Sequence, residues 1–124
     1  MDYSQLSDFE INVAVFEAIH NGSPDYKEGE NGAMVFISFE GDIVNGDSVE
    51  VEVERGSFNP CANPADAWPI IMENMISVCA YKRANPGMKA VSWWEADSFG
   101  EHITLDDNPL RAAMIVFLMM QRIQ

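Results

Sequence analysis

The fold is decided by a stretch near the end of the chain, Asn108-Pro109-Leu110-Arg111-Ala112-Ala113-Met114-Ile115-Val116-Phe117-Leu118-Met119-Met120. Asn108 can cap a helix by accepting a bond from an orphan backbone N–H. Pro109 fits the first helical position because it has no N–H to leave unpaired. The apolar run that follows is about half of the roughly 20 residues that a membrane span needs. The stretch therefore predicts a buried helix from Pro109 to about Arg122.

A second segment opens in the same way, with the sequence Asn63-Pro64-Ala65-Asp66-Ala67-Trp68-Pro69. The Asn-Pro pair predicts a helix over residues 64–74. Pro69 should kink or shorten it, because a proline beyond the first turn removes a backbone bond. Asp66 stands where a capping-box acid reaches back to the backbone N–H of the cap.

A third helix is predicted over residues 8–20. Ser7-Asp8-Phe9-Glu10 has the form of a capping box, and apolar residues then recur at helical spacing. The pair Asn21-Gly22 supplies the end of the helix, because both residues tolerate a left-handed backbone.

The sequence predicts strands between these helices, over residues 34–39, 49–54, 75–80 and 90–96. Residues 49–54 alternate Val with Glu, which describes a strand with its Val face packed and its Glu face in water. Asn45-Gly46 is a strong hairpin signal. The remaining segments, 22–32, 55–62, 82–88 and 97–107, are expected to be loops.

The resulting order of elements is α-β-β-α-β-β-α. It predicts an α+β fold in which a small antiparallel sheet packs against about three helices, with the very apolar last helix placed centrally. We expect residues 1–124 to form a single acidic globular domain. Cys61 and Cys79 are too few for a disulfide framework, and no secretory signal opens the chain, so a cytosolic setting is expected.

Charge is the strongest compositional feature. The chain carries 20 acidic and 7 basic residues, a net charge of −13. Residues 1–60 hold thirteen acids against Lys27 and Arg55, or −11, whereas residues 61–124 come to −2. Such a balance disfavours direct binding of nucleic acid. It suits either a solvated, soluble surface or an acidic face that meets a basic partner or imitates the charge of DNA.

No motif indicates catalysis, a metal or a cofactor. The sequence lacks metal-ligand spacing, a phosphate-binding Gly-rich loop and a nucleophile elbow. Nothing local supports Cys61 as a nucleophile with His102 as its base. The acids around His102 have the irregular spacing of a solvated loop; they are Asp97, Glu101, Asp106 and Asp107. We therefore expect no catalytic residue, no metal and no cofactor.

Arg111 is the candidate that most needs an explanation. It is the single charge in an otherwise apolar helix, and in the first helical turn it meets the helix dipole with the wrong sign, an effect of about 0.3–1 kcal/mol. A fork-like pair with Asp66 or another acid, a cluster of carbonyls, or an anionic ligand would offset that cost. The sequence leaves the structural and the binding interpretation open, and in either case we expect Asp66 and Trp68 nearby.

Tryptophans complete the candidate site. Trp68 is predicted to anchor the core, with stacking on a planar ligand as the alternative. Trp93 and Trp94 are adjacent in a predicted strand and should point to opposite faces, which leaves one of them available to a ligand. The candidate ligand-binding residues are Asn63, Asp66, Trp68, Trp94 and Arg111.

Several motifs resemble the NinX family of lambdoid bacteriophages. The first is the segment Phe58-Asn59-Pro60-Cys61-Ala62-Asn63-Pro64-Ala65-Asp66-Ala67-Trp68-Pro69-Ile70-Ile71, with Glu73-Asn74 and Ile76-Ser77 beyond it. The ending from Asn108 to Gln121 and the opening from Met1 to Asn12 are similar to the same family. The resemblance implies a phage accessory protein that acts in the cytoplasm of the infected bacterium, and it implies no particular biochemical activity.

Three functions remain open at this point. The first, which we favour, is a non-enzymatic, host-directed binding protein of the anti-defence type, which sequesters a small anionic or nucleotide-like ligand or a host component. The second is an acidic, DNA-mimicking inhibitor of a basic host protein. The third is a small enzyme acting on a phosphorylated substrate. We expect no membrane partner and no direct nucleic-acid partner, and a homo-oligomer stays open. Eight methionines suit adaptable packing at an interface, although filling of the core is their more ordinary use.

Overall fold

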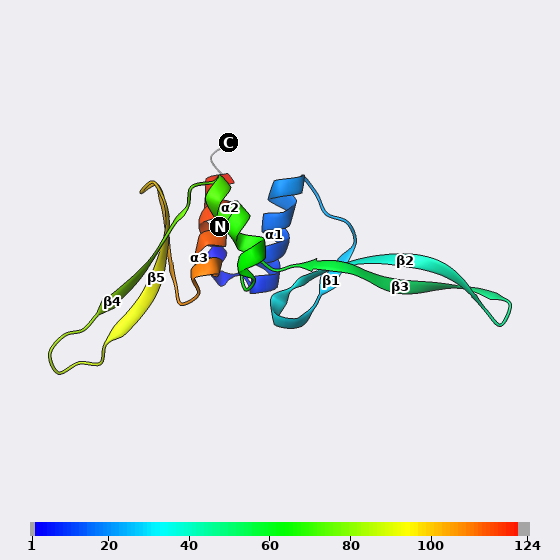
Figure 1. The fold of residues 1–124 in the computed structure, drawn as a ribbon, viewed down its shortest axis with the longest axis horizontal. Coiled ribbons are helices and arrows are strands. Elements are labelled where there is room, and N and C mark those ends of the chain that lie inside the picture. The colour runs from blue at the N-terminus through cyan, green and yellow to red at the C-terminus, as the bar shows by residue number, and fades with distance from the viewer. Residues whose placement is uncertain (1, 122–124) are drawn as a thin grey trace.

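The computed structural model describes residues 2–121. Three helices occupy its middle, α1 (Asp8–His20), α2 (Pro64–Glu73) and α3 (Pro109–Gln121). Two antiparallel sheets project from them to opposite sides, as Figure 1 shows. One sheet holds β1 (Tyr26–Glu28), β2 (Met34–Val44) and β3 (Asp47–Phe58); the other holds β4 (Ser77–Arg83), β5 (Val91–Ser98) and β6 (His102–Asp106). Two short 3-10 turns, η1 (Tyr3–Gln5) and η2 (Glu30–Gly32), are the remaining elements of the described residues. The predicted α+β class is confirmed.

The three helices begin where the sequence predicts, because their caps are local. In α1, Ser7 and Glu10 make both bonds of the capping box, and Asn21 ends the helix with a left-handed backbone. The Asn63 side chain accepts a bond from the N–H of Ala65 and so caps α2, which continues through Pro69 to Glu73. The Asn108 Oδ1 accepts from the N–H of Leu110 at 2.9 Å and caps α3; the predicted last residue, Arg122, lies outside the described residues.

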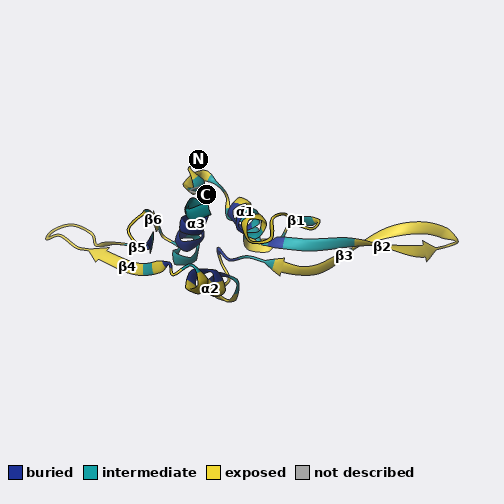
Figure 2. Cartoon of the chain, turned by 90° about the horizontal axis from the view of Figure 1, so that it is seen from above, coloured by how far each residue is buried: buried dark blue, intermediate teal, exposed yellow. Residues whose placement is uncertain are grey.

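The core lies around α3. An unbroken run from Ala112 to Leu118 is buried, including Phe117, and α3 contacts α1, α2, β5 and β6. Figure 2 shows this burial concentrated in the helices, while the outer ends of both hairpins are exposed. The prediction of a central, apolar last helix is confirmed. The strands, in contrast, lie on both sides of the helices in two sheets rather than in one.

The longer hairpin differs from its prediction in length and in packing. Asn45 and Gly46 form a two-residue turn with φ of 53° and 84°, which places Val44 opposite Asp47 and fixes the register. Every residue from Phe39 to Glu52 is exposed. The prediction that the Val face is packed is therefore wrong for the single chain. The strands extend past the helices, so no element of the same chain covers that face. We call residues 37–54 the β2–β3 arm.

Two strands fall in segments that the sequence predicts as loops. β1 has only three residues, too few for a periodic pattern. β6 follows a turn at Phe99 and Gly100, whose φ angles are 51° and 78°. Its alternation of Ile103 and Leu105 with Thr104 is also too short to stand out. Both strands are recognised only through their partners β2 and β5.

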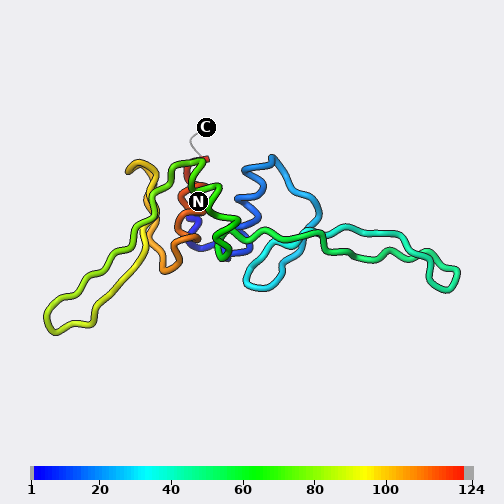
Figure 3. Tube along the Cα trace, in the orientation of Figure 1, coloured from blue at the N-terminus to red at the C-terminus, as the bar shows by residue number. Residues whose placement is uncertain are grey.

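The path of the chain can be followed in Figure 3, which shows the trace running out to the tip of each hairpin and back to the helices. The opening turn η1 returns to α3. Among the described residues, no helix has the length and the apolar character required to cross a membrane.

Candidate functional site

Arg111 is held by acceptors from three parts of the chain. Its Nη1 donates to Asp8 at 2.7 Å, and its Nε donates to Asp106 at 3.1 Å. Its Nη2 donates to the backbone carbonyls of Ser4 and Leu6, at 3.1 and 2.8 Å. The side chain is only 15% exposed. The carboxylates and carbonyls together offset the unfavourable position of the charge at the start of α3.

The expected pairing of Arg111 with an acid is confirmed, but its partners are Asp8 and Asp106 and not Asp66. Asp66 instead accepts a bond from the backbone N–H of Asn59 at 2.8 Å, on the connection that leads into α2. It does not reach back to the backbone N–H of Asn63 as a capping-box acid would, because that N–H donates to the Asn59 carbonyl. Four of the five N–H donors of Arg111 have protein acceptors, so the guanidinium has little capacity left for an anion.

Trp68 does not anchor the core. Its side chain is 58% exposed on α2, whereas its helical neighbours Ala67, Ile70 and Ile71 are buried. Trp94 is half-buried in β5, opposite Ala80 and Asp106. Trp93 and Trp94 lie on opposite faces of the strand, as predicted.

Cys61 lies inside the protein beneath the start of α3. Its backbone carbonyl accepts a bond from the Asn108 side chain at 2.7 Å, and its N–H donates to the Asn12 side chain at 3.1 Å. Burial, aided by the nearby Asp8 carboxylate, raises the pKa of the Cys61 thiol to about 12. A thiol so rarely ionised is a poor nucleophile.

The acids near His102 are dispersed by the strand pairing. Asp106 binds Arg111, and Asp97 accepts a bond from the N–H of Gly100 in the β5–β6 turn. His102 pairs with Ser98, and its buried Nε2 has no hydrogen-bond partner in the part of the chain described. Within residues 2–121, no group of three His, Cys, Asp or Glu side chains converges as a metal site would require.

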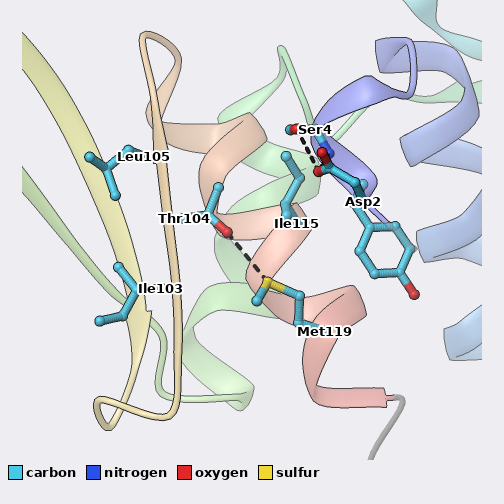
Figure 4. A pocket seen from close by; sticks show the side chains of 8 residues that line it. Asp2, Ser4, Ile103, Thr104, Leu105, Ile115 and Met119 are labelled. Atoms are coloured by element: carbon cyan, nitrogen blue, oxygen red, sulfur yellow. Dashed lines mark hydrogen bonds between the residues drawn. The ribbon is translucent and has the colours of Figure 1, made fainter.

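The sheet β4–β5–β6 presents one face to α3 and the other to solvent. Figure 4 shows Thr104 directed towards α3, where its hydroxyl lies 3.4 Å from the sulfur of Met119, whereas Ile103 and Leu105 point to the other side of β6. The rings of Tyr81 and Trp93 stack on that outer side, with centroids 5.8 Å apart and an interplanar angle of 13°. The sequence does not reveal this aromatic pair of exposed Tyr81 and half-buried Trp93, because only the register between β4 and β5 brings the two rings together.

The β2–β3 arm carries the acidic surface. Lys27 pairs with Glu52 and Glu54, and Arg55 pairs with Glu40. The three carboxylates nearest the tip have no ion-pair partner among the described residues; they are Asp42, Asp47 and Glu50. The negative charge of the first half of the chain is thus most exposed at the end of the arm.

Comparison with known protein families gives a match over nearly the whole chain. The profile of the family described as Bacteriophage P22, NinX, matches residues 2–121, nearly the whole chain. The chain belongs to the NinX family. The match joins the opening, central and final motifs into one NinX sequence and includes the β2–β3 arm. Comparisons with curated proteins and with solved structures give no match.

Proposed function

We propose that this NinX-family protein is a non-enzymatic phage accessory protein that acts in the cytoplasm of the infected bacterium. It binds a basic host protein through the β2–β3 arm and sequesters it, an activity of the anti-defence type. The observation that carries the proposal is the composition of the arm, which exposes apolar side chains and carboxylates side by side along its whole length.

Each face of the arm combines the two kinds of side chain. The register places Ile37, Phe39 and Ile43 on one face with three glutamates of β3, and the three valines of β3 on the other face with acids of β2 and the turn. Phe39, Ile43, Val49 and Val51 are all more than two-fifths exposed. Contiguous apolar side chains in water mark a macromolecular interface, and the unpaired carboxylates specify a basic partner.

The charge of the arm is sparse compared with that of DNA. Side chains on one face of a strand repeat about every 6.8 Å, whereas duplex DNA carries a charge for about every 1.7 Å of its axis. A partner of the arm therefore needs apolar contact as well as positive charge. This favours a protein-binding surface of mixed character over a surface that only imitates the charge of DNA.

The alternative of a nucleotide-like ligand depends on Arg111. Its guanidinium is engaged by Asp8, Asp106 and two carbonyls, and Asp66 is engaged elsewhere. Arg111, the one cation among the five candidate ligand-binding residues, thus keeps a single unengaged N–H donor, fewer than a two-pronged phosphate contact uses. Native mass spectrometry of freshly purified protein tests this branch directly. We expect a ligand-free mass, and a retained phosphate-containing ligand would contradict the proposal.

Neutralising the tip of the arm tests the proposal itself. A triple variant with Asp42→Asn, Asp47→Asn and Glu50→Gln removes the unpaired carboxylates. A matched control with Glu73→Gln, Glu101→Gln and Asp107→Asn removes three exposed acids elsewhere. We expect the wild-type protein and the control to retain the same basic host protein from a bacterial lysate, and the arm variant to lose it.

Salt provides a second criterion for the same experiment, because contacts between exposed charges are screened. The retained host protein should dissociate as ionic strength rises, and the purified pair should show the same dependence. Equal retention of that host protein by the arm variant and by the control would contradict the arm as the binding surface.

A further inference from the structure

The outer face of the sheet β4–β5–β6 is a second uncovered surface, on the opposite side of the molecule from the arm (Figure 1). We define the outer face by the side chains that the register directs away from α3: Tyr81, Arg83, Val91, Trp93, Glu95, Asp97, Ile103 and Leu105, with Cys79 and Ser77. The inner face, in contrast, buries Ala96, Ser98 and Thr104.

Apolar side chains form the centre of the outer face. Tyr81, Val91, Ile103 and Leu105 are 44%, 53%, 49% and 59% exposed. These side chains come from all three strands, and Glu95 and Asp97 of β5 share the face with them. A group of exposed apolar side chains on a small monomer marks an interaction site. The outer face therefore has the apolar centre that a stable protein interface requires.

Two contacts hold the aromatic pair on this face in place. Trp93 stacks on Tyr81, and its Nε1 donates to Glu95 at 2.9 Å. The indole therefore presents an apolar surface while its one polar atom is satisfied. A fixed aromatic ring loses little conformational freedom when a partner covers it, so this pair fits the role of an anchor at the centre of an interface.

The charges of the outer face are complementary to one another across a two-fold axis. Arg83 lies opposite Val91 at one end of the β4–β5 ladder, and Asp97 lies at the other end. Asp97 follows Val91 by six residues along β5. The two charges are thus about 20 Å apart in one copy. Arg83 makes no ion pair with any described residue. Turning a second copy over onto the face by a two-fold rotation brings each arginine to the opposite aspartate.

The surface area of the chain also indicates a partner. The accessible surface is 8035 Å² for a mass of 13.9 kDa. A folded monomer of this mass exposes about 6,700 Å², so the excess is about 1,300 Å². A standard interface covers about 800 Å² on each partner. The excess is larger than the area that one partner covers in such an interface.

We propose that a second copy of this chain docks on the outer face and forms a two-fold symmetric dimer. The apolar centres of the two faces pack together, and Arg83 of each copy pairs with the partner's Asp97. The arms point away from this interface, so the dimer leaves both free. This inference does not depend on the function proposed for the arm.

Sedimentation equilibrium of the full chain tests the dimer, with the variants Leu105→Glu and Met72→Glu. Leu105 and Met72 are both 59% exposed, but Met72 lies on α2, away from the outer face. We expect the wild type and Met72→Glu to be dimers, and Leu105→Glu to bind its partner copy at least tenfold more weakly. Circular dichroism melts should show that Leu105→Glu still folds.

Two results would overturn the proposal. One is a wild-type protein that stays monomeric up to about 0.1 mM. The other is a dimer that Leu105→Glu leaves intact, because the copies would then meet through another surface, such as the arms. Equal weakening by Met72→Glu and Leu105→Glu would likewise show that the outer face is not the interface.

A charge exchange tests the two-fold arrangement. Homodimers of Arg83→Glu place two acids together, and homodimers of Asp97→Lys place two bases together. A mixed dimer of the two variants restores both ion pairs. Native mass spectrometry of the mixture should therefore show the heterodimer in clear excess over the statistical half. A statistical distribution would contradict the arrangement. Asp97 also accepts a bond from the N–H of Gly100 in the β5–β6 turn. A thermal melt of Asp97→Lys alone shows whether loss of that bond unfolds the protein.

Discussion

Arg111 joins the opening of the chain to its last helix. Its acceptors come from η1 and the following residue, from the first residue of α1, and from the end of β6. Removing the side chain would leave two carboxylates and two carbonyls without their common donor. The cluster therefore ties the opening of the chain to α3, and we expect its loss to lower the stability of the fold.

We predict that Arg111→Ala lowers the free energy of unfolding by about 2–4 kcal/mol, because it breaks a largely buried charge network. Arg111→Lys should lose part of this amount, since one ammonium cannot replace the planar fork. Urea melts measure both. Arg55→Ala is the matched control. Its ion pair with Glu40 is half-exposed, and we expect a change below about 1 kcal/mol. Similar losses for Arg55→Ala and Arg111→Ala would contradict the network.

The two cysteines should differ sharply in reactivity. Cys79 is exposed on β4, whereas Cys61 is buried with its thiol pKa raised to about 12. A raised pKa favours the neutral thiol, so at pH 8 only about one Cys61 in ten thousand carries the reactive thiolate. Cys79 belongs to the outer face, so the test uses the monomeric variant Leu105→Glu: iodoacetamide should label Cys79 alone in the folded variant and both cysteines in urea. Labelling of native Cys61 at the rate of Cys79 would show that the site opens readily.

The residues of the candidate site differ in how much of their environment the sequence predicts. Arg111 can be recognised as needing an acceptor, because its conflict with the helix dipole is local. Its partner Asp8 cannot be identified, because 103 residues separate the two along the chain and only the packing of α1 against α3 brings them together. The same holds for Trp68: its place on α2 is predictable, but its exposed direction depends on which face of that helix packs.

At the scale of elements, the helices were predicted closely because caps and apolar periodicity are local properties. The sequence predicts the ends of the strands less accurately, and it does not predict their division into two sheets. The Val and Glu alternation over residues 49–54 correctly predicts a strand, yet it describes only the faces of that strand. Whether a face is covered depends on the distance of the hairpin from the helices, which no local pattern encodes.

Helix α3 is the element on which the core depends. Phe117 is 5% exposed in the middle of its buried run. We predict that Phe117→Ala lowers the free energy of unfolding by about 3–5 kcal/mol, because it deletes a large side chain and leaves a cavity. Phe99→Ala, at a residue that is 73% exposed, should change it by less than about 0.5 kcal/mol. Chemical denaturation compares the two, and a loss below 1 kcal/mol for Phe117→Ala would place the burial of α3 in doubt.

Alanine substitutions at two glycines distinguish the cost of backbone strain from the cost of a steric clash. Gly32 and Gly46 have φ of 77° and 84°, but a Cβ at Gly32 would lie 2.9 Å from the Cβ of Asp8, whereas a Cβ at Gly46 would meet nothing. Alanine at Gly46 should therefore cost about 1–2 kcal/mol from strain alone. Gly32→Ala should cost about 1–3 kcal/mol more, because η2 must move from the start of α1. Equal melting temperatures of the two variants would contradict this contact.

At the scale of the whole molecule, the arm and the outer face lie on opposite sides of one helical core. A dimer formed through the outer face therefore carries two arms pointing outwards, so one dimer can hold two copies of a basic partner or two sites on one partner. The second contact would then form at a raised effective concentration and strengthen binding without any new surface. In the proposed dimer, the division of the strands into two sheets places self-association and partner binding on separate surfaces.

The extended shape can be measured in solution by small-angle X-ray scattering. A compact chain of 124 residues has a radius of gyration of about 14 Å. The projecting arm should raise the radius of gyration of monomeric Leu105→Glu clearly above that figure.

Shortening the arm provides the control. Replacing residues 41–50 of the Leu105→Glu variant by Asn-Gly keeps Glu40 opposite Val51. It also keeps the alternation of hydrogen-bonded and non-hydrogen-bonded pairs, so that the new two-residue turn joins the same kind of pair as the old one. It shortens the arm by about 14 Å. We expect a smaller radius with an unchanged melting temperature, because residues 39–52 are exposed and the helices form the core. An arm folded back onto the helices would give the compact radius before the deletion and a lower melting temperature after it.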